Sequence, residues 1–206
     1  MHNEPVKTIT RVGHFENGAW INAETLKIYV DEDAESPREC FDHFGHMICF
    51  HRRYKLGDKN HGIDEDDFSS WDEMEQHLIN EIGAVVILPI YMYDHSGITI
   101  STTSFSCRFD SGQIGFIYVT SKDILENWME SVLTADLKEK ARNLLRGEVK
   151  EYDDFLTGNV YGYVLEDENG ENIDSCWGFY GDDAIDEIKS EMHIHSTKPA
   201  TPTQVA

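Results

Sequence analysis

Residues 84–93 (AVVILPIYMY) constrain the fold more than any other part of the sequence, because every side chain in this run is apolar or aromatic. Branched and aromatic residues favour strands, so we expect a central strand here. Pro89 cannot donate to a strand ladder, which predicts a bulge or an unpaired edge at that point. Residues 94–97 (DHSG) are typical of a turn, and the alternating pattern of 98–106 then predicts a hairpin.

The rest of the chain shows both strand and helix patterns. Further strands are expected at short apolar runs bounded by polar or turn-forming residues, at 26–30, 47–50, 114–119, 160–165 and 173–179. Helices are expected where apolar residues recur at three-to-four spacing, at 71–82, 121–132, 134–156 and 182–192. Ser121 and Thr134 are the expected N-caps of the second and third helices, and Gly83 and Gly158 are expected to end the first and third. Asn169-Gly170 between the last two strands is a strong hairpin signal. Together these patterns predict an α+β fold with a largely antiparallel sheet and three or four helices.

The length of 206 residues is compatible with one core. We expect a flexible segment at 1–15, a single α+β domain at 16–193, and a disordered tail at 194–206, which lacks large apolar residues near its end. No apolar run approaches the ~18–20 residues of a membrane span, and residues 1–15 lack the apolar centre of a signal peptide. We therefore expect a soluble, intracellular protein.

Charge is the most informative surface property of this sequence. The chain has 39 Asp and Glu against 17 Lys and Arg, a formal net charge of −22. Such a balance disfavours direct nucleic-acid binding, because affinity for phosphates depends on Lys and Arg. Ten acidic residues and only one base, Arg108, lie between Lys59 and Lys122, and twelve acidic residues and no base lie between Lys150 and Lys189.

Two interpretations of the acidic residues follow. In the first, the acidic residues keep the protein soluble. In the second, their spacing imitates the phosphates of a nucleic-acid duplex, and they bind a basic groove on another protein. The candidate binding residues form two groups: Asp64, Glu65, Asp66 and Asp67, and Asp182, Asp183, Asp186 and Glu187.

Basic residues are concentrated in two places. Lys138, Arg142, Arg146 and Lys150 stand four apart and predict a basic stripe on the long helix at 134–156. A second patch consists of Arg52, Arg53 and Lys55. Because the stripe could pair with an acidic face of a second copy, the sequence leaves a homodimer open.

Candidate chemistry is confined to a few residues. His95, Cys107 and Asp110 could meet if a hairpin returns Cys107 towards the turn at Asp94-His95, and an imidazole beside a thiolate would activate it. A buried cysteine that only packs is the alternative. His43 and His46 could share one helical turn and bind a metal, but no HExxH or paired CxxC accompanies them. We expect no cofactor.

The four cysteines are widely spaced. They form no CxxC pair, so neither a disulfide scaffold nor a zinc ribbon is predicted, and reduced thiols are expected.

Several motifs occur together along the chain: ESPRECF, CFHRRYKLGD, LPIYMYDHSGI, SFSCRFDSGQIGFIYV, VYGYVLED and DSCWGFYG. In this combination the chain resembles a family of uncharacterised proteins encoded by bacteriophages and integrated mobile elements, over residues 26–181. The resemblance implies expression in a bacterial cytoplasm. It implies no activity and no catalytic residue.

Charge and context lead to one hypothesis with two rivals. We expect a non-enzymatic inhibitor whose acidic faces engage a basic host protein, such as a nuclease, a restriction enzyme or a CRISPR component, by nucleic-acid mimicry. The first rival is a small hydrolase-like enzyme using Asp94, His95, Cys107 and Asp110. The second is a structural or regulatory phage protein.

Overall fold

The computed structural model describes residues 4–11, 13–16 and 19–195. It confirms the α+β class and the antiparallel pairing of the strands. Contacts within the chain group it into two compact units. Unit 1 comprises the described residues up to Ala34 and from Gly158, and unit 2 comprises residues 35–157. The single α+β domain expected at 16–193 stays a prediction.

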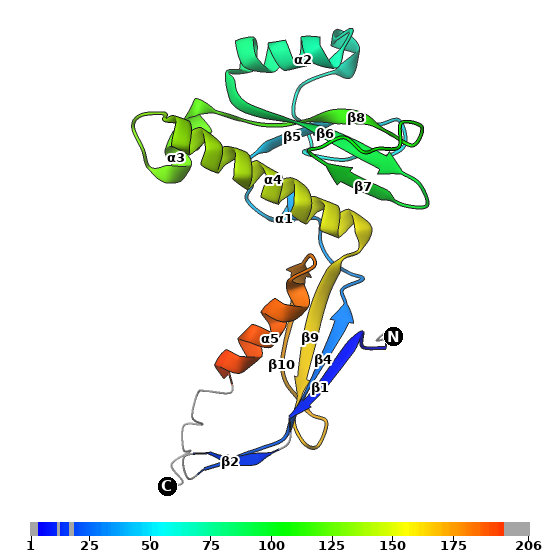
Figure 1. The fold of residues 1–206 in the computed structure, drawn as a ribbon, viewed down its shortest axis with the longest axis vertical. Coiled ribbons are helices and arrows are strands. Elements are labelled where there is room, and N and C mark those ends of the chain that lie inside the picture. Colours follow the sequence, from blue (N-terminus) through cyan, green and yellow to red (C-terminus); the bar gives the residue numbers. More distant parts are fainter. Residues whose placement is uncertain (1–3, 12, 17–18, 196–206) are drawn as a thin grey trace. The chain divides into compact units, whose positions relative to one another are not determined.

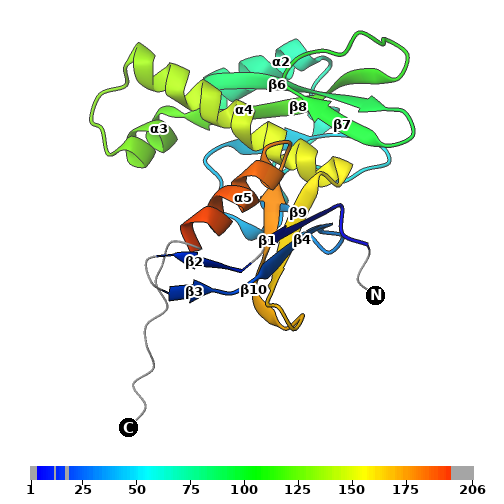
Figure 2. The ribbon, with the colours of Figure 1, turned by 60° about the horizontal axis from the view of Figure 1, so that its bottom comes forward.

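Unit 1 is an antiparallel sheet with a helix on one face (Figures 1 and 2). The strand order is β1 (Lys7–Arg11), β4 (Glu24–Val30), β9 (Val160–Glu166) and β10 (Asn172–Tyr180). A separate pair consists of β2 (His14–Glu16) and β3 (Ala19–Ile21). Helix α5 (Ala184–His195) packs its Ala184 and Ile188 against Leu26, Ile28, Tyr163, Leu165 and Phe179.

Two predictions for unit 1 can be compared with the structure. The Asn-Gly hairpin is confirmed: β9 and β10 pair, and Gly170 adopts the left-handed φ of 81° that such a turn favours. The segment 1–15 was expected to be flexible, but Lys7–Arg11 forms β1 and pairs with β4. The strand was missed because only Ile9 contributes an apolar side chain to the core, so no alternation is visible. Of the expected tail, residues 196–206 lie outside the described part of the chain.

Unit 2 is a sheet with helices on both faces (Figure 1). The strand order is β5 (His46–Cys49), β8 (Ser111–Thr120), β6 (Ala84–Asp94) and β7 (Ile98–Ser101), all antiparallel. On one face lies the long helix α4 (Ala135–Thr157), and on the other lies α2 (Trp71–His77), which continues as the π-helix η2 (Leu78–Ile82). The remaining elements are α1 (Pro37–Cys40), the 3-10 helix η1 (Glu65–Asp67) and α3 (Ser121–Trp128).

Each face of the unit 2 sheet has its own core. On the α4 side, Leu137, Ala141, Leu145 and Val149 pack against alternate residues of β6 and β8, including Val86, Ile90, Ile117 and Val119. On the α2 side, Met74 and Leu78 pack against Ile48, Ala84, Phe116 and Tyr118. Burial on both faces explains why residues 84–93 are apolar without interruption.

The expected irregularity at Pro89 is present in β6. The ladder between β6 and β8 shifts register between Ile90 and Tyr91, and β7 pairs only with Tyr91–Asp94. Pro89 therefore faces a β8 partner on one side and no β7 partner on the other.

Helix boundaries follow capping chemistry. Ser121 was the expected N-cap of α3, but Thr120 takes that role and forms a capping box with Asp123. The expected cap Thr134 is confirmed by a hydrogen bond that its hydroxyl accepts from Leu137 N (3.2 Å). Gly83 and Gly158 adopt left-handed φ values of 81° and 73°, which end the preceding helices as predicted.

Within the described residues, no helix combines the length and apolar character that crossing a bilayer requires.

Candidate functional site

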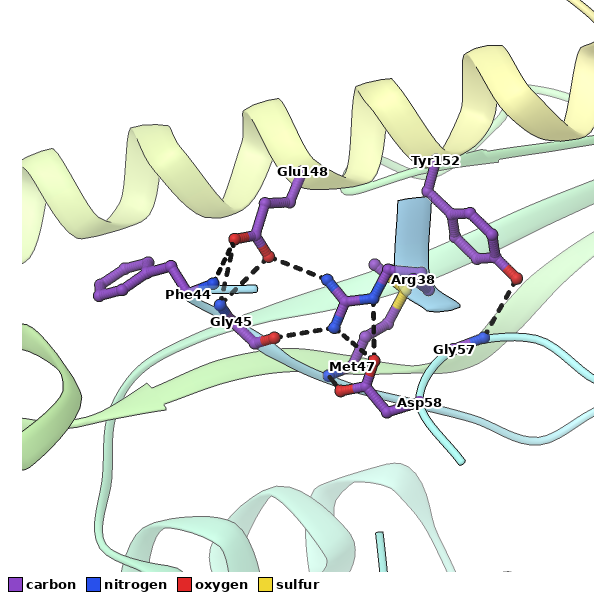
Figure 3. Close-up of polar contacts among 8 residues, drawn as sticks. All are labelled: Arg38, Phe44, Gly45, Met47, Gly57, Asp58, Glu148 and Tyr152. Carbon is purple, nitrogen blue, oxygen red and sulfur yellow. Dashed lines mark hydrogen bonds and ion pairs between the residues drawn. The ribbon is translucent and has the colours of Figure 1, made fainter. Parts of the chain in front are cut away.

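Arg38 is the centre of a buried charge network in unit 2 (Figure 3). Its side chain is only 2% exposed. The guanidinium donates to Asp58 Oδ1 through Nε (2.9 Å) and Nη2, to Glu148 Oε2 through Nη1 (3.0 Å), and to Gly45 O through Nη2 (2.8 Å). Two carboxylates and a carbonyl thus occupy the planar donor fork of one arginine.

The same two carboxylates also hold backbone. Asp58 Oδ2 accepts from Met47 N (2.7 Å), and Glu148 accepts from the amides of Phe44 and Gly45 at 2.8–3.2 Å. One turn further along α4, the Tyr152 hydroxyl accepts from Gly57 N (3.4 Å). Because α4 supplies Glu148 and Tyr152, this network fastens α1, which carries Arg38, and the segment around Asp58 to the long helix (Figure 3).

A hollow of about 740 Å³ opens beside this network. It lies wholly within unit 2 and shares Gly57, Asp58 and Tyr152 with the network. Its other walls come from Ser36, Glu39, Cys49, Phe50, His51, Tyr54, Lys55, Leu56, Lys59, Asn60, His61 and Glu65. The hollow has the size of a small-molecule site and mixes aromatic with polar walls.

Two protonated groups line the hollow. Cys49 is half-buried as a residue, and desolvation, reinforced by the Asp58 carboxylate, raises the pKa of its thiol to about 12. Desolvation also raises the pKa of Tyr152. Both groups therefore keep their protons at neutral pH and present hydrogen-bond donors.

We expect Cys49 to react with a maleimide at pH 8 at least about a hundredfold more slowly than the exposed Cys176, because the thiolate is the nucleophile and Cys49 is held as a thiol. Mass spectrometry of the alkylated peptides over time measures both rates in one sample. All four cysteines should react alike in urea. Equal rates for the two thiols in the native protein would contradict the assignment.

One segment of unit 2 carries many acidic side chains and no base. The segment from Asp64 to Glu81 contains eight carboxylates and no Lys or Arg: Asp64, Glu65, Asp66, Asp67, Asp72, Glu73, Glu75 and Glu81. All are exposed except the half-buried Glu75. None forms an ion pair with a Lys or Arg among the residues that the structure describes. We call this segment the α2 acidic face.

Some of these carboxylates also have a local structural role. Asp64 accepts from Asp66 N (3.1 Å) at the start of η1. Glu73 accepts from the hydroxyl and amide of Ser69 (2.6 and 2.8 Å), and these hydrogen bonds hold the pKa of Glu73 below its usual value. The negative charge of Glu73 is therefore retained to lower pH than in a free side chain.

The second predicted group belongs to unit 1 and surrounds the start of α5. Asp182 accepts from Asn159 Nδ2 (2.9 Å), and Asp186 pairs with Lys189. This hydrogen-bonded pair holds the pKa of Asp186 below its usual value. Asp186 and Glu187 lie in the first turn of α5, where carboxylates stabilise a helix. This group is thus partly neutralised and has a local structural role.

The predicted basic stripe on α4 is partly neutralised within the helix. Lys150 pairs with Asp154 (2.5 Å), and Arg142 and Arg146 both pair with Glu139. These pairs within one helix reduce the free charge through which the stripe could hold a second copy.

The residues of the predicted enzyme alternative meet at one end of the sheet. Asp110 Oδ2 lies 3.6 Å from Cys107 Sγ and 3.5 Å from His95 Nδ1, and Asp94 N donates to Asp110 O (2.8 Å). Asp94 also pairs with Arg53. Among the described residues, no hydrogen bond joins His95 to Cys107. The Asp110 carboxylate lies between the thiol and the imidazole. In a typical nucleophilic site the base contacts the nucleophile directly, so this arrangement differs from one. The His95 side chain is 64% exposed, so little excludes water here.

The histidines suggested for a metal do not form a metal site. His46 Nε2 lies 3.2 Å from Asp123 Oδ2 and its ring contacts Tyr118. Within the described ranges, no group of three or more His, Cys, Asp or Glu side chains is arranged to hold a metal ion.

Sequence reasoning missed the Arg38 network and the hollow. Arg38 stands 20 residues from Asp58 and 110 from Glu148, so no local pattern connects them. The one available signal was a single base in the acidic context ESPREC.

Comparisons with family models, with curated proteins and with solved structures found no match to this chain.

Proposed function

We propose that this chain is a non-enzymatic binding protein whose α2 acidic face engages a basic, nucleic-acid-binding partner. The observation that carries the proposal is the set of eight carboxylates from Asp64 to Glu81. The segment contains no Lys or Arg, and in the described structure none of these carboxylates forms an ion pair with a Lys or Arg. Elsewhere, α4 and the start of α5 place bases beside their acids. Unpaired like charges repel one another, so their grouping in one segment favours a role in binding.

The resemblance to mobile-element proteins supports a more specific form of this proposal. In that form the protein acts in a bacterial cytoplasm and inhibits a host nuclease, restriction enzyme or CRISPR component by occupying its nucleic-acid groove. The carboxylates of Asp182, Asp183, Asp186 and Glu187 would add to the interaction, but less, because Asp186 already pairs with Lys189.

Affinity capture from a bacterial lysate, at low and at high salt, tests the proposal. A basic nucleic-acid-binding protein should be retained at low salt, be released as the salt rises, and be displaced by duplex DNA, because an acidic face and DNA compete for one groove. Retention through molar salt, or indifference to competing DNA, would count against mimicry.

A second candidate function rests on the arrangement of Cys107, His95 and Asp110. If the protein is a hydrolase, removing the thiol or the imidazole should abolish its effect on the partner. We expect instead that Cys107→Ala and His95→Ala each change the affinity for the captured partner by less than about twofold, because exposed contacts away from an interface contribute little. Titration of each variant against the partner measures this. A loss of the biological effect in both variants would favour the enzyme.

A further inference from the structure

The hollow beside the Arg38 network shares one lining residue, Glu65, with the α2 acidic face, and its other lining residues have no role in the proposed function. Its volume of about 740 Å³ falls within the ~300–1,000 Å³ typical of small-molecule sites. Phe50, Tyr54 and Leu56 supply apolar wall, and the remaining lining is polar. Such a combination of apolar walls and a few polar groups is typical of sites that orient an organic ligand.

The acceptors that line the hollow are largely occupied. Both oxygens of Asp58 accept hydrogen bonds, from Arg38 and from Met47 N. Glu39 Oε1 pairs with Lys59 Nζ (2.8 Å). Glu65 is the acidic lining residue without an ion pair to a Lys or Arg in the described structure, and it is exposed.

The donors that line the hollow are largely unused. The Tyr152 residue is 4% exposed, and its oxygen accepts from Gly57 N, but its hydroxyl hydrogen has no acceptor among the described residues. The Cys49 thiol and the Lys55 ammonium likewise have no hydrogen-bond or ion-pair partner within the part of the chain that the structure describes. An excess of donors matches a ligand that offers several acceptor oxygens.

One cation in the lining remains available to such a ligand. Lys59 pairs with Glu39 and Asp58 pairs with Arg38, whereas Lys55 has no ion pair within the described residues. Desolvation lowers the pKa of His51, and the nearby charges of Arg53 and Arg52 lower it further.

We propose that this hollow binds a small phosphate monoester, whose phosphoryl oxygens accept hydrogen bonds from Lys55 and Tyr152. A phosphoryl group offers three acceptor oxygens and a charge that a lysine ammonium matches. Inorganic phosphate alone would leave most of the volume unfilled. The organic body of the ester therefore lies against the apolar wall of Phe50 and Leu56.

Calorimetric titration of the full chain tests the site with four probes: adenosine 5′-monophosphate, ribose 5-phosphate, inorganic phosphate and succinate. At least one ester should bind with a Kd below about 1 mM, and inorganic phosphate and succinate should bind at least about tenfold more weakly. Lys55→Ala should weaken the ester about tenfold, because it removes a charge-assisted hydrogen bond. Lys122→Ala is the matched control, since it removes an exposed lysine of unit 2 outside the hollow.

Three results would each overturn the proposal. The first is no heat of binding for either ester at millimolar concentration. The second is an equal affinity of the Lys55→Ala and Lys122→Ala variants for the ester, at unchanged melting temperature. The third is binding of succinate or inorganic phosphate as tight as that of the ester. The outcome is independent of the partner proposal, because neither lysine belongs to the α2 acidic face.

Discussion

Arg38→Met is expected to lower the free energy of unfolding of unit 2 by about 3–5 kcal/mol, the typical cost of removing one partner from a buried ion pair. Arg38 is 2% exposed, and its loss leaves Asp58 and Glu148 as neighbouring carboxylates without their shared cation. Methionine fills much of the same volume, so the effect reports charge and hydrogen bonding instead of a cavity. Urea denaturation followed by circular dichroism and tryptophan fluorescence measures the change.

Arg142→Met is the matched control for this prediction. It makes the same substitution on the surface of α4, where Arg142 pairs with the exposed Glu139. Exposed pairs of this kind contribute about 0–1 kcal/mol. If the two variants shift the urea midpoint equally, the Arg38 network does not stabilise the fold in the way that its geometry indicates.

Neutralising four carboxylates of the α2 acidic face is expected to weaken binding of the captured basic partner about a hundredfold at low salt. The variant combines Asp64→Asn, Glu65→Gln, Asp66→Asn and Asp67→Asn. Four charge pairs at roughly 0.7 kcal/mol each sum to ~2.8 kcal/mol, or about two powers of ten in Kd. The fold should survive, because all four side chains are exposed and Asn caps a helix as well as Asp does. Affinity measured across a salt series should also show a shallower slope.

A control variant separates the face from the net charge. Glu126→Gln, Glu130→Gln, Asp136→Asn and Glu139→Gln remove the same formal charge from exposed positions of unit 2 outside the α2 acidic face. At physiological ionic strength we expect this variant to lose less than about threefold in affinity, since attraction between exposed charges more than about 8 Å apart is largely screened there. Equal losses in both variants would mean that the partner senses overall charge and no particular surface.

Much of the fold could be predicted because its signals are local. The uninterrupted apolar run in β6, the Asn169-Gly170 turn and the three-to-four spacing along α4 each depend on neighbours within a few residues. The failures also have a local cause. β1 contributes one apolar residue to its core, and Thr120 and Ser121 are both capable caps, so the pattern could not choose between them.

In the candidate sites, too, the features that depend on neighbouring residues could be predicted and those that depend on side-chain geometry could not. The grouping of acids from Asp64 to Glu81 is visible in the sequence, because they are contiguous and no base interrupts them. That Asp186 is held by Lys189, or that Arg142 shares Glu139 with Arg146, depends on side-chain geometry within a turn of helix. The hairpin alone predicts that Cys107, His95 and Asp110 lie near one another. It does not predict that the Asp110 carboxylate lies between the thiol and the imidazole.

The sequence by itself therefore determined the class of the fold, the positions of most strands and helices, and the segment that carries unpaired negative charge. Only the tertiary structure brought Arg38 to Asp58 and Glu148, and Tyr152 to Gly57, and so formed the hollow between Cys49 and Lys55. The reason is physical: periodicity and turn chemistry act over a few residues, whereas a buried ion network requires groups far apart in the chain to meet where water is excluded.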